Sequence, residues 1–105
     1  MAFKVELSRR AERDIEEAFE HIHADAPPNA LRWRKRLERR LQILERTPEA
    51  FGLAPENCDA LAEVRQLLFG RYRILYTVRS LSVFVLTVRH GARLFLSGRE
   101  LDSIE

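Results

Sequence analysis

The sequence predicts an α+β fold in which a hairpin of two helices packs on a mostly antiparallel four-stranded sheet, in the order β-α-α-β-β-β. Two observations carry this prediction. Between Ser8 and Pro48 the chain shows two apolar stripes with helical spacing, separated by a Pro-Pro pair. Residues 63–90 instead contain three short runs rich in β-branched and aromatic side chains. With 105 residues the chain is long enough for one core, so a single domain is expected over residues 1–105.

The first strand and the first helix are predicted at the start of the chain. Residues 3–7 alternate apolar and polar side chains, which is typical of a strand with one buried face. Ser8 follows as a helix N-cap, because its side-chain oxygen can accept from a backbone N–H of the first turn. Pro27 and Pro28 end this helix. Its apolar stripe is spaced by three and four residues and consists of Ala11, Ile15, Ala18, Phe19 and Ile22.

The second helix begins near Pro28 or Asn29 and ends before Pro48, because a residue that precedes proline avoids helical geometry. Its apolar stripe consists of Ala30, Trp33, Leu37, Leu41 and Leu44. Its remaining face is basic and carries Arg32, Arg34, Lys35, Arg36, Arg39 and Arg40. A short turn joins the two helices, which predicts an antiparallel hairpin. The basic face is interpreted either as a solvated surface or as a contact for nucleic-acid phosphates.

Three strands are predicted after a loop over residues 48–62. They cover residues 63–69, 72–78 and 82–88, and the last extends to His90 in an alternative assignment. Short turns join them, so they are expected to form an antiparallel meander. The third strand is apolar at nearly every position, which is typical of a central strand covered on both faces. Residues 94–105 are expected to form either a short helix or a flexible tail.

Composition limits the function classes. Cys58 is the only cysteine, which excludes an internal disulfide and a cysteine-based metal site. Residues 1–7 lack the apolar run of a signal peptide, and no segment has the roughly 20 apolar residues that span a bilayer. We therefore expect a cytoplasmic protein with no membrane partner, no metal and no cofactor. Sixteen of the 18 basic residues are Arg, and residues 60–93 hold six Arg against the single acid Glu63, which favours contact with an anion.

Several segments together resemble the RelE/ParE superfamily of toxins from bacterial type II toxin–antitoxin systems. They are the helical hairpin with Trp33 and residues 54–57 (APEN), 63–70 (EVRQLLFG), 72–78 (YRILYTV) and 88–93 (VRHGAR). The resemblance spans most of the chain and implies a toxin of the kind described as a plasmid stabilisation protein. It also implies a cognate antitoxin that wraps the toxin, and a target that is either messenger RNA in the ribosome or DNA gyrase.

Cleavage of RNA without a metal needs a base for the 2′-hydroxyl proton, an acid for the leaving oxygen, and cations around the phosphate. Glu63 or His90 is the candidate base, and His90 is also the candidate acid. Arg65 and Arg73 complete the candidate catalytic set. The candidate phosphate-binding residues are Arg71, Arg89 and Arg93.

The sheet is expected to gather four of these side chains into one solvent-open, anion-binding patch of Arg65, Arg73, His90 and Arg93. The alternative interpretation of the arginines is salt bridges to Glu63 or Glu56. The alternative interpretation of His90 is a local structural role at a strand end. Its alternation would then place it on the core side, together with Phe84, Leu86 and Val88.

Ribosome-dependent mRNA cleavage is the leading functional hypothesis, which would make the protein an endoribonuclease (mRNA interferase). Two departures count against it: the three predicted C-terminal strands contain no lysine, and Gly91 and Ala92 follow His90, where several RNA-cleaving relatives carry an aromatic residue or a lysine. The alternatives are inhibition of DNA gyrase without catalysis, and an inactive protein that only binds its antitoxin. Any oligomer is expected to form through the antitoxin complex.

Overall fold

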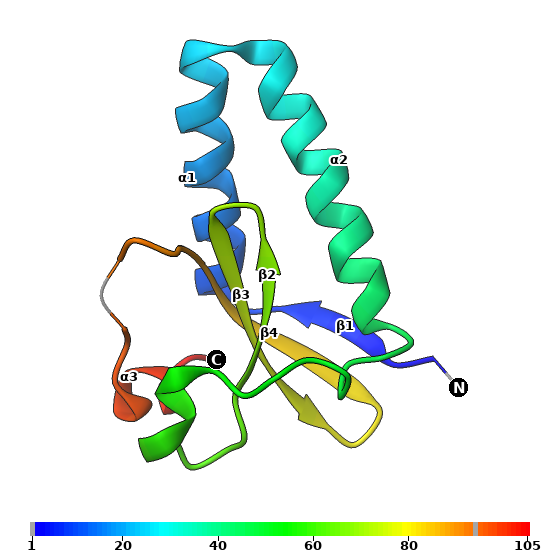
Figure 1. The fold of residues 1–105 in the computed structure, drawn as a ribbon, viewed down its shortest axis with the longest axis vertical. Helices are drawn as coiled ribbons and strands as arrows, with labels where there is room; N and C mark the ends of the chain where they lie inside the picture. The colour runs from blue at the N-terminus through cyan, green and yellow to red at the C-terminus, as the bar shows by residue number, and fades with distance from the viewer. Residues whose placement is uncertain (1, 94) are drawn as a thin grey trace.

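The computed structural model describes residues 2–93 and 95–105, with every side chain among them except that of Asp59. Figure 1 shows the elements in chain order. They are β1 (Lys4–Leu7), α1 (Arg9–Asp25), α2 (Pro27–Leu44), the 3-10 helix η1 (Pro55–Asp59), β2 (Arg65–Phe69), β3 (Tyr72–Arg79), β4 (Ser82–His90) and α3 (Gly98–Asp102). The predicted α+β class and the order β-α-α-β-β-β are confirmed, with η1 and α3 added.

The sheet has the strand order β1-β4-β3-β2. β3 pairs antiparallel with both β2 and β4, which confirms the predicted meander. β1 pairs parallel with β4, an arrangement that needs the long connection that the helices and two strands provide. β4 is therefore flanked on both sides, in the central position that its apolar sequence predicted.

β2 begins two residues later than predicted, at Arg65. The reason is that the η1 loop takes the hydrogen bonds of the preceding residue. Val64 N–H donates to the side-chain Oδ1 of Asn57 at 2.8 Å, and the Val64 carbonyl accepts from Ala54 N–H at 2.9 Å. Glu63 consequently lies outside the sheet, in the loop that leads into β2.

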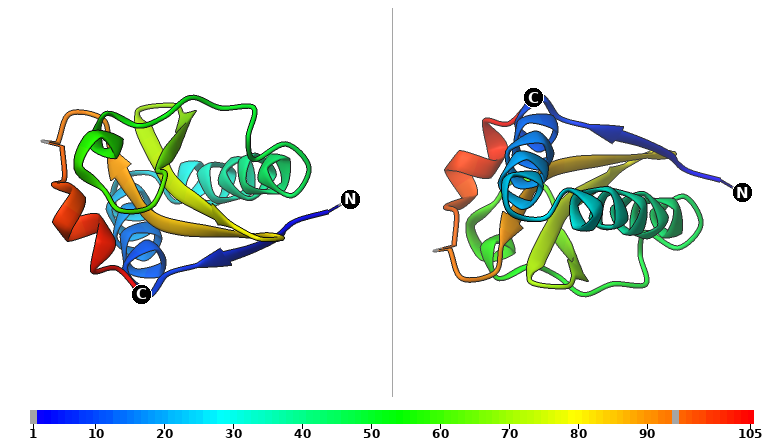
Figure 2. Two further views of the ribbon diagram at one scale, coloured as in Figure 1. Left: turned by 90° about the horizontal axis from the view of Figure 1, so that it is seen from below. Right: turned by 90° about the horizontal axis from the view of Figure 1, so that it is seen from above.

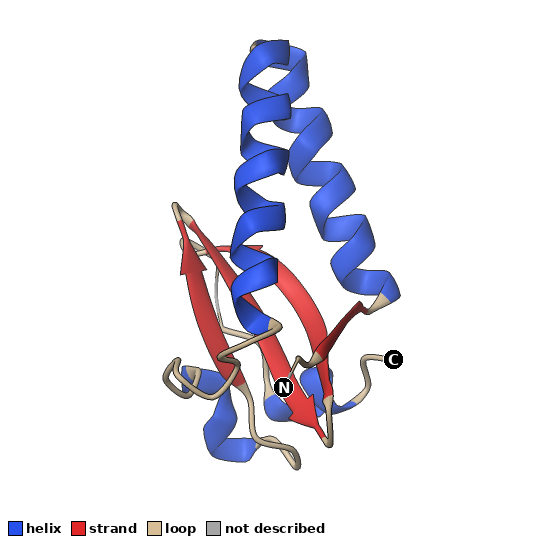
Figure 3. Ribbon diagram, turned by 90° about the vertical axis from the view of Figure 1, so that its right-hand side faces the viewer, coloured by secondary structure: helices blue, strands red, loops and turns tan. Residues whose placement is uncertain are grey.

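α1 and α2 form the predicted antiparallel hairpin, which covers one face of the sheet and extends beyond its edge (Figure 3). Ser8 joins the hairpin to the sheet, because its hydroxyl donates to the Leu86 carbonyl at 2.7 Å and accepts from Ala11 N–H at 2.9 Å. The main core lies between the helices and the sheet and includes Ile15, Trp33, Leu37, Leu67, Ile74 and Val85. Trp33 is 6% exposed, as its place on the apolar stripe predicted.

The opposite face of the sheet is covered by η1 and the C-terminal segment (Figure 2). A second core lies there and contains Ala54, Val64, Leu75, Leu86, Leu96 and Leu101. α3 begins with a capping box, in which the Ser97 hydroxyl accepts from Glu100 N–H and the Glu100 carboxylate accepts from Ser97 N–H. Residues 95–105 thus include a short helix that contacts η1, while Leu94 lies outside the described residues.

A β-bulge interrupts the pairing of β3 with β4. Leu75 lies opposite Thr87, whereas the next residue of β3, Tyr76, lies opposite Val85. Leu86 is therefore the extra residue of β4. The side chains that follow the bulge change faces relative to simple alternation.

His90 lies on the helix-covered face because of this bulge. Val88, two residues earlier, belongs to the main core, and the His90 ring packs edge-on against Tyr72 at a centroid distance of 5.4 Å. Phe84 and Leu86 pack in the second core, on the other face. The predicted alternation of His90 with Phe84 and Leu86 is wrong, and only its shared face with Val88 holds.

Candidate functional site

Arg73 of β3 is buried against the protein's own carboxylate. Its Nη1 and Nη2 donate to the two carboxylate oxygens of Glu56 at 3.0 and 2.8 Å, and Nη1 also donates to Gln66 at 3.1 Å. The side chains of Arg73 and Glu56 are only 8% and 0% exposed. Leu96 N–H donates to Glu56 at 3.3 Å, and the Arg73 guanidinium lies 5.1 Å from the centroid of the Phe95 ring. The pair therefore ties the C-terminal segment to η1 and β3.

Glu56 remains ionised in this environment. Burial alone would raise its pKa, but hydrogen bonds from Arg73 and from backbone N–H groups, together with the charge of Arg73, hold the pKa below the ordinary value of 4.5. A depressed folded-state pKa means that the ionised group stabilises the fold above its ordinary pKa. This contribution is lost as the pH falls through the folded-state pKa.

We expect this linkage to appear in urea unfolding between about pH 6 and about pH 3. The free energy of unfolding of the wild type should fall with pH, and that of Glu56→Gln should fall less, because the variant has no carboxylate to protonate at this position. Equal falls in both proteins would show that Glu56 contributes nothing to the acid sensitivity.

Arg65, the first residue of β2, is held by a second carboxylate and by the loop beside it. Its Nη2 lies 2.9 Å from Glu63 Oε1, and its Nη1 donates to the Phe51 carbonyl at 2.6 Å and to the Glu49 carbonyl at 3.4 Å. The Glu63 side chain is 59% exposed, so this pair is screened by solvent. Both arginines thus form the salt bridges of the alternative interpretation.

Tyr76 lies opposite Arg65 across the β2–β3 pair and is fully buried. Its hydroxyl donates to the backbone carbonyl of Pro48. Burial raises the pKa of Tyr76 to about 12, although the charge of Arg65 lowers it. Tyr76 therefore stays protonated near neutral pH and belongs to the main core.

His90 borders a cavity of about 490 Å³ between α1 and the end of β4. Its Nδ1 accepts from Ala92 N–H at 3.1 Å, so the proton of the neutral ring is on Nε2. Other ionisable side chains line the cavity, namely Asp14, Glu17, His21, Tyr72 and Arg93. The imidazole is thus fixed locally at the strand end and lies beside an ionisable cluster.

Arg89 lies opposite Arg73 in the β3–β4 pair. Desolvation lowers the pKa of Arg89, and the positive charges of Arg10, Arg93 and Arg73 lower it further, while Asp14 raises it. Arg89 thus lies opposite Arg73 and close in sequence to Arg93, which follows the end of β4. Arg89 and Arg93, two of the predicted phosphate-binding residues, belong to this basic region.

The predicted single solvent-open patch is wrong. Arg73 lies on the face opposite the helices and is enclosed by Glu56, whereas His90 lies on the helix-covered face. Arg65 and His90 lie opposite β3 residues that are four positions apart, or about 13 Å along a strand. The bulge and the carboxylate supplied by η1 account for the difference. The individual roles of these residues stay predictions.

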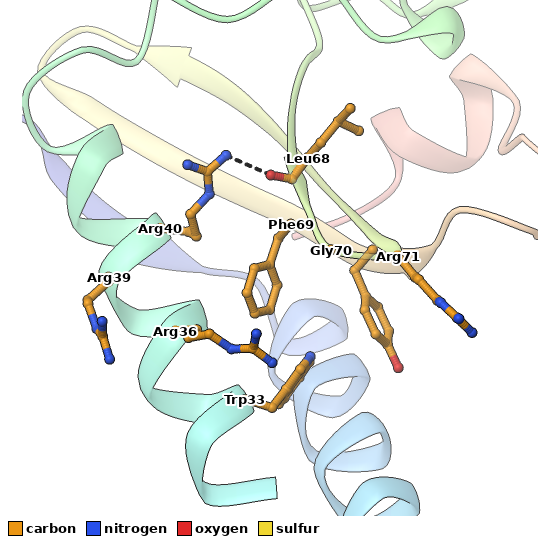
Figure 4. Close-up of a pocket in the computed structure, with 9 residues that line it drawn as sticks. Trp33, Arg36, Arg39, Arg40, Leu68, Phe69, Gly70 and Arg71 are labelled. Atoms are coloured by element: carbon orange, nitrogen blue, oxygen red, sulfur yellow. Dashed lines mark hydrogen bonds between the residues drawn. The ribbon is translucent and has the colours of Figure 1, made fainter. Parts of the chain in front are cut away.

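A groove of about 680 Å³ lies between α2 and the β2–β3 hairpin (Figure 4). Its floor is aromatic: the Trp33 ring lies 5.8 Å from that of Phe69 and 5.5 Å from that of Tyr72, measured between centroids. Its rim is basic and consists of Arg36, Arg39, Arg40 and Arg71. The groove thus combines an apolar floor with guanidinium groups on both sides.

Two local features shape the groove. Arg40 Nη2 donates to the Leu68 carbonyl at 2.7 Å, which ties α2 to the outer edge of β2 (Figure 4). The two-residue turn between Phe69 and Tyr72 has Gly70 at φ +57°, a left-handed conformation that favours glycine, and it presents the exposed Arg71.

Sequence reasoning missed this groove, because its walls come from segments about thirty residues apart in the chain. Trp33 was expected only in the core, and Arg71 only as a phosphate contact. The available signal was the position of Arg36 and Arg40, three and seven residues after Trp33, which places them beside it on the helix surface.

No group of three or more His, Cys, Asp and Glu side chains within residues 2–93 and 95–105 lies close enough together to hold a metal ion. Across the same ranges, no helix is both long and apolar enough to cross a membrane.

Comparison with known proteins gives a family for the chain. A family model described as the ParE toxin of the type II toxin–antitoxin system parDE matches residues 5–95. A search of curated proteins found no match.

The fold is similar to three solved structures, each at low sequence identity. A chain of the chromosomal ParDE toxin–antitoxin system from P. aeruginosa aligns with a TM-score of 0.72 and 16% identity, over 85% of this chain and 96% of that chain. A chain of the RelBE2 toxin–antitoxin complex from Mycobacterium tuberculosis aligns with a TM-score of 0.56 and 22% identity, over 86% and 99%. A mutant of the E. coli toxin RelE in the free state aligns with a TM-score of 0.56 and 22% identity, over 88% and 86%. These similarities establish the fold, while the family match covers most of the sequence. The chain therefore belongs to the ParE toxin family of type II toxin–antitoxin systems, within the RelE/ParE superfamily.

Proposed function

We propose that this toxin arrests growth by binding DNA gyrase without catalysing RNA cleavage, and that a cognate antitoxin neutralises it. The ParE family match supports gyrase as the target. One observation favours gyrase binding over mRNA cleavage: Arg73 is buried and donates to both carboxylate oxygens of Glu56.

RNA cleavage would require several groups to surround one phosphate. Arg73 reaches a phosphate only by leaving Glu56, and breaking such a buried pair costs about 3–5 kcal/mol. Arg65 is engaged by Glu63 and two backbone carbonyls, and His90 lies on the other face of the sheet from Arg73. The geometry therefore favours a binding toxin over the cleavage hypothesis that led on sequence alone.

His90→Ala separates the two functions. We expect the purified wild-type protein to inhibit supercoiling of a relaxed plasmid by gyrase, and His90→Ala to inhibit equally. A general acid contributes about 10²–10⁴ in rate, so an RNA-cleaving toxin would lose its activity with this substitution. Mapping of RNA ends on translating ribosomes after induction provides the second readout. Unimpaired supercoiling, with messenger cut by the wild type and left intact by His90→Ala, would refute the proposal.

We propose that the antitoxin binds in the groove between α2 and the β2–β3 hairpin. The floor of Trp33, Phe69 and Tyr72 accepts apolar side chains, and the arginine rim suits flanking acidic residues. Two of the similar structures are those of toxin–antitoxin assemblies, which supports an antitoxin partner for this chain.

A further inference from the structure

The exposed side of α2 carries four cations, Arg32, Lys35, Arg36 and Arg39, which we call the α2 stripe. They are spaced by three and four residues, so they lie along one side of the helix, and all four are exposed. None of the ion pairs recorded among side chains of the described residues involves them. The only acid in α2 is Glu38, which lies beside the stripe and not within it. The stripe is thus an unneutralised row of positive charge.

The α2 stripe opposes the stability of the helix that bears it. Like charges three or four residues apart repel on a helix surface, as Arg32 and Arg36 do, and as Lys35 and Arg39 do. Packing of the opposite side of α2 already holds the helix on the fold, through Ala30, Trp33, Leu37 and Leu44. Neutral polar residues would keep the exposed side of α2 equally well hydrated, without the repulsion between like charges. An anionic partner accounts for the arrangement.

The spacing of the charges identifies the kind of anion. From Arg32 to Arg39 the axis of α2 rises about 10 Å, so successive positive charges lie on average about 3.5 Å apart along the axis. One strand of duplex DNA carries one phosphate per about 3.4 Å of its axis. A single row of carboxylates four residues apart on a helix carries one per about 6 Å, and an acidic strand carries one per about 7 Å on one face. A nucleic-acid backbone therefore matches the charge spacing of the stripe better than either of these single acidic rows does.

The shape and chemistry of the hairpin agree with this match. Three of the four cations are Arg, whose planar guanidinium binds phosphate in a bidentate manner. The hairpin extends beyond the sheet (Figure 3), and a single helix fits the major groove of a duplex. We propose that the α2 stripe binds the phosphate backbone of duplex DNA without sequence specificity.

The test measures binding of a fluorescently labelled duplex by anisotropy, at KCl concentrations from about 50 to about 200 mM. Four phosphate contacts predict a slope of log K against log[salt] of about −3.5. Arg32→Gln combined with Lys35→Gln should make the slope shallower by about 2 and weaken binding at least about tenfold at the lowest salt. Neither residue lines the antitoxin groove, so this variant leaves the groove unchanged.

The matched control is Arg9→Gln combined with Arg13→Gln, which removes two exposed charges with four-residue spacing from α1. It should bind DNA within twofold of the wild type, and thermal melting should show that both double variants remain folded. Absence of binding at the lowest salt, equal losses in the two double variants, tighter binding of a single-stranded RNA, or equal binding of polyglutamate would each overturn the proposal. The assay contains no gyrase, so its outcome is independent of the supercoiling experiment.

Discussion

Replacing Glu56 by Gln should lower the free energy of unfolding by about 3–5 kcal/mol, because it leaves the buried guanidinium of Arg73 without a charge partner. In a domain of this size, each kcal/mol lowers the melting temperature by about 4–8 °C. Together these two figures predict that the variant melts more than about 10 °C below the wild type. Urea unfolding at neutral pH and thermal circular dichroism measure the two quantities.

Glu63→Gln is the matched control, because Glu63 also pairs with an arginine but is exposed. Its cost should stay below about 1 kcal/mol. Glu56→Gln combined with Arg73→Met should recover part of the lost stability, since apolar replacements of buried ion pairs are often tolerated. Equal losses from Glu56→Gln and Glu63→Gln would mean that the burial of the Arg73 pair has no energetic consequence.

Reversing charge on both sides of the groove should weaken antitoxin binding by roughly 30- to 100-fold, on the order of 2–3 kcal/mol. The variant combines Arg39→Glu on α2 with Arg71→Glu on the β2–β3 turn. Both side chains are exposed, so the fold should be unaffected, while an acidic partner would meet like charge. The product of the neighbouring gene, which is the candidate antitoxin, is titrated into the variant and into the wild type. Calorimetry then gives the two dissociation constants.

Arg9→Glu combined with Arg79→Glu makes the same change of charge at exposed positions outside the groove. The dissociation constant of this control for the antitoxin should stay within about threefold of the wild-type value. Any difference should arise mainly from a change in the association rate. If the two double variants weaken binding equally, net charge and not the groove determines the affinity.

Local sequence patterns were sufficient for most of the fold. The N-cap Ser8, the Pro27-Pro28 stop and the alternating strands each act over a few residues, and the elements lie where these signals predicted, apart from the later start of β2. The central position of β4 followed from its apolar composition, because only a strand covered on both faces carries such a sequence.

The candidate site could not be predicted in the same way, because it depends on contacts between distant segments. The bulge at Leu86 reverses the alternation that placed His90, and nothing in the local sequence marks that extra residue. Glu56 lies in η1, seventeen residues before Arg73 in the chain. Whether Arg73 is paired therefore depends on how the segment that contains η1 folds back onto the sheet. The alternative interpretation of the sequence did include a salt bridge between an arginine and Glu56, and the structure confirms this pairing for Arg73.

The parallel pairing of β1 with β4 has a consequence for the synthesis of this toxin. Residues 4–7 leave the ribosome well before their partners, residues 82–85, which are translated more than seventy residues later. The nascent chain therefore cannot complete this sheet until residues 82–85 have emerged, and contacts of such long sequence separation form slowly. The part of the toxin surface that rests on this sheet therefore forms late, only after residues 82–85 have left the ribosome.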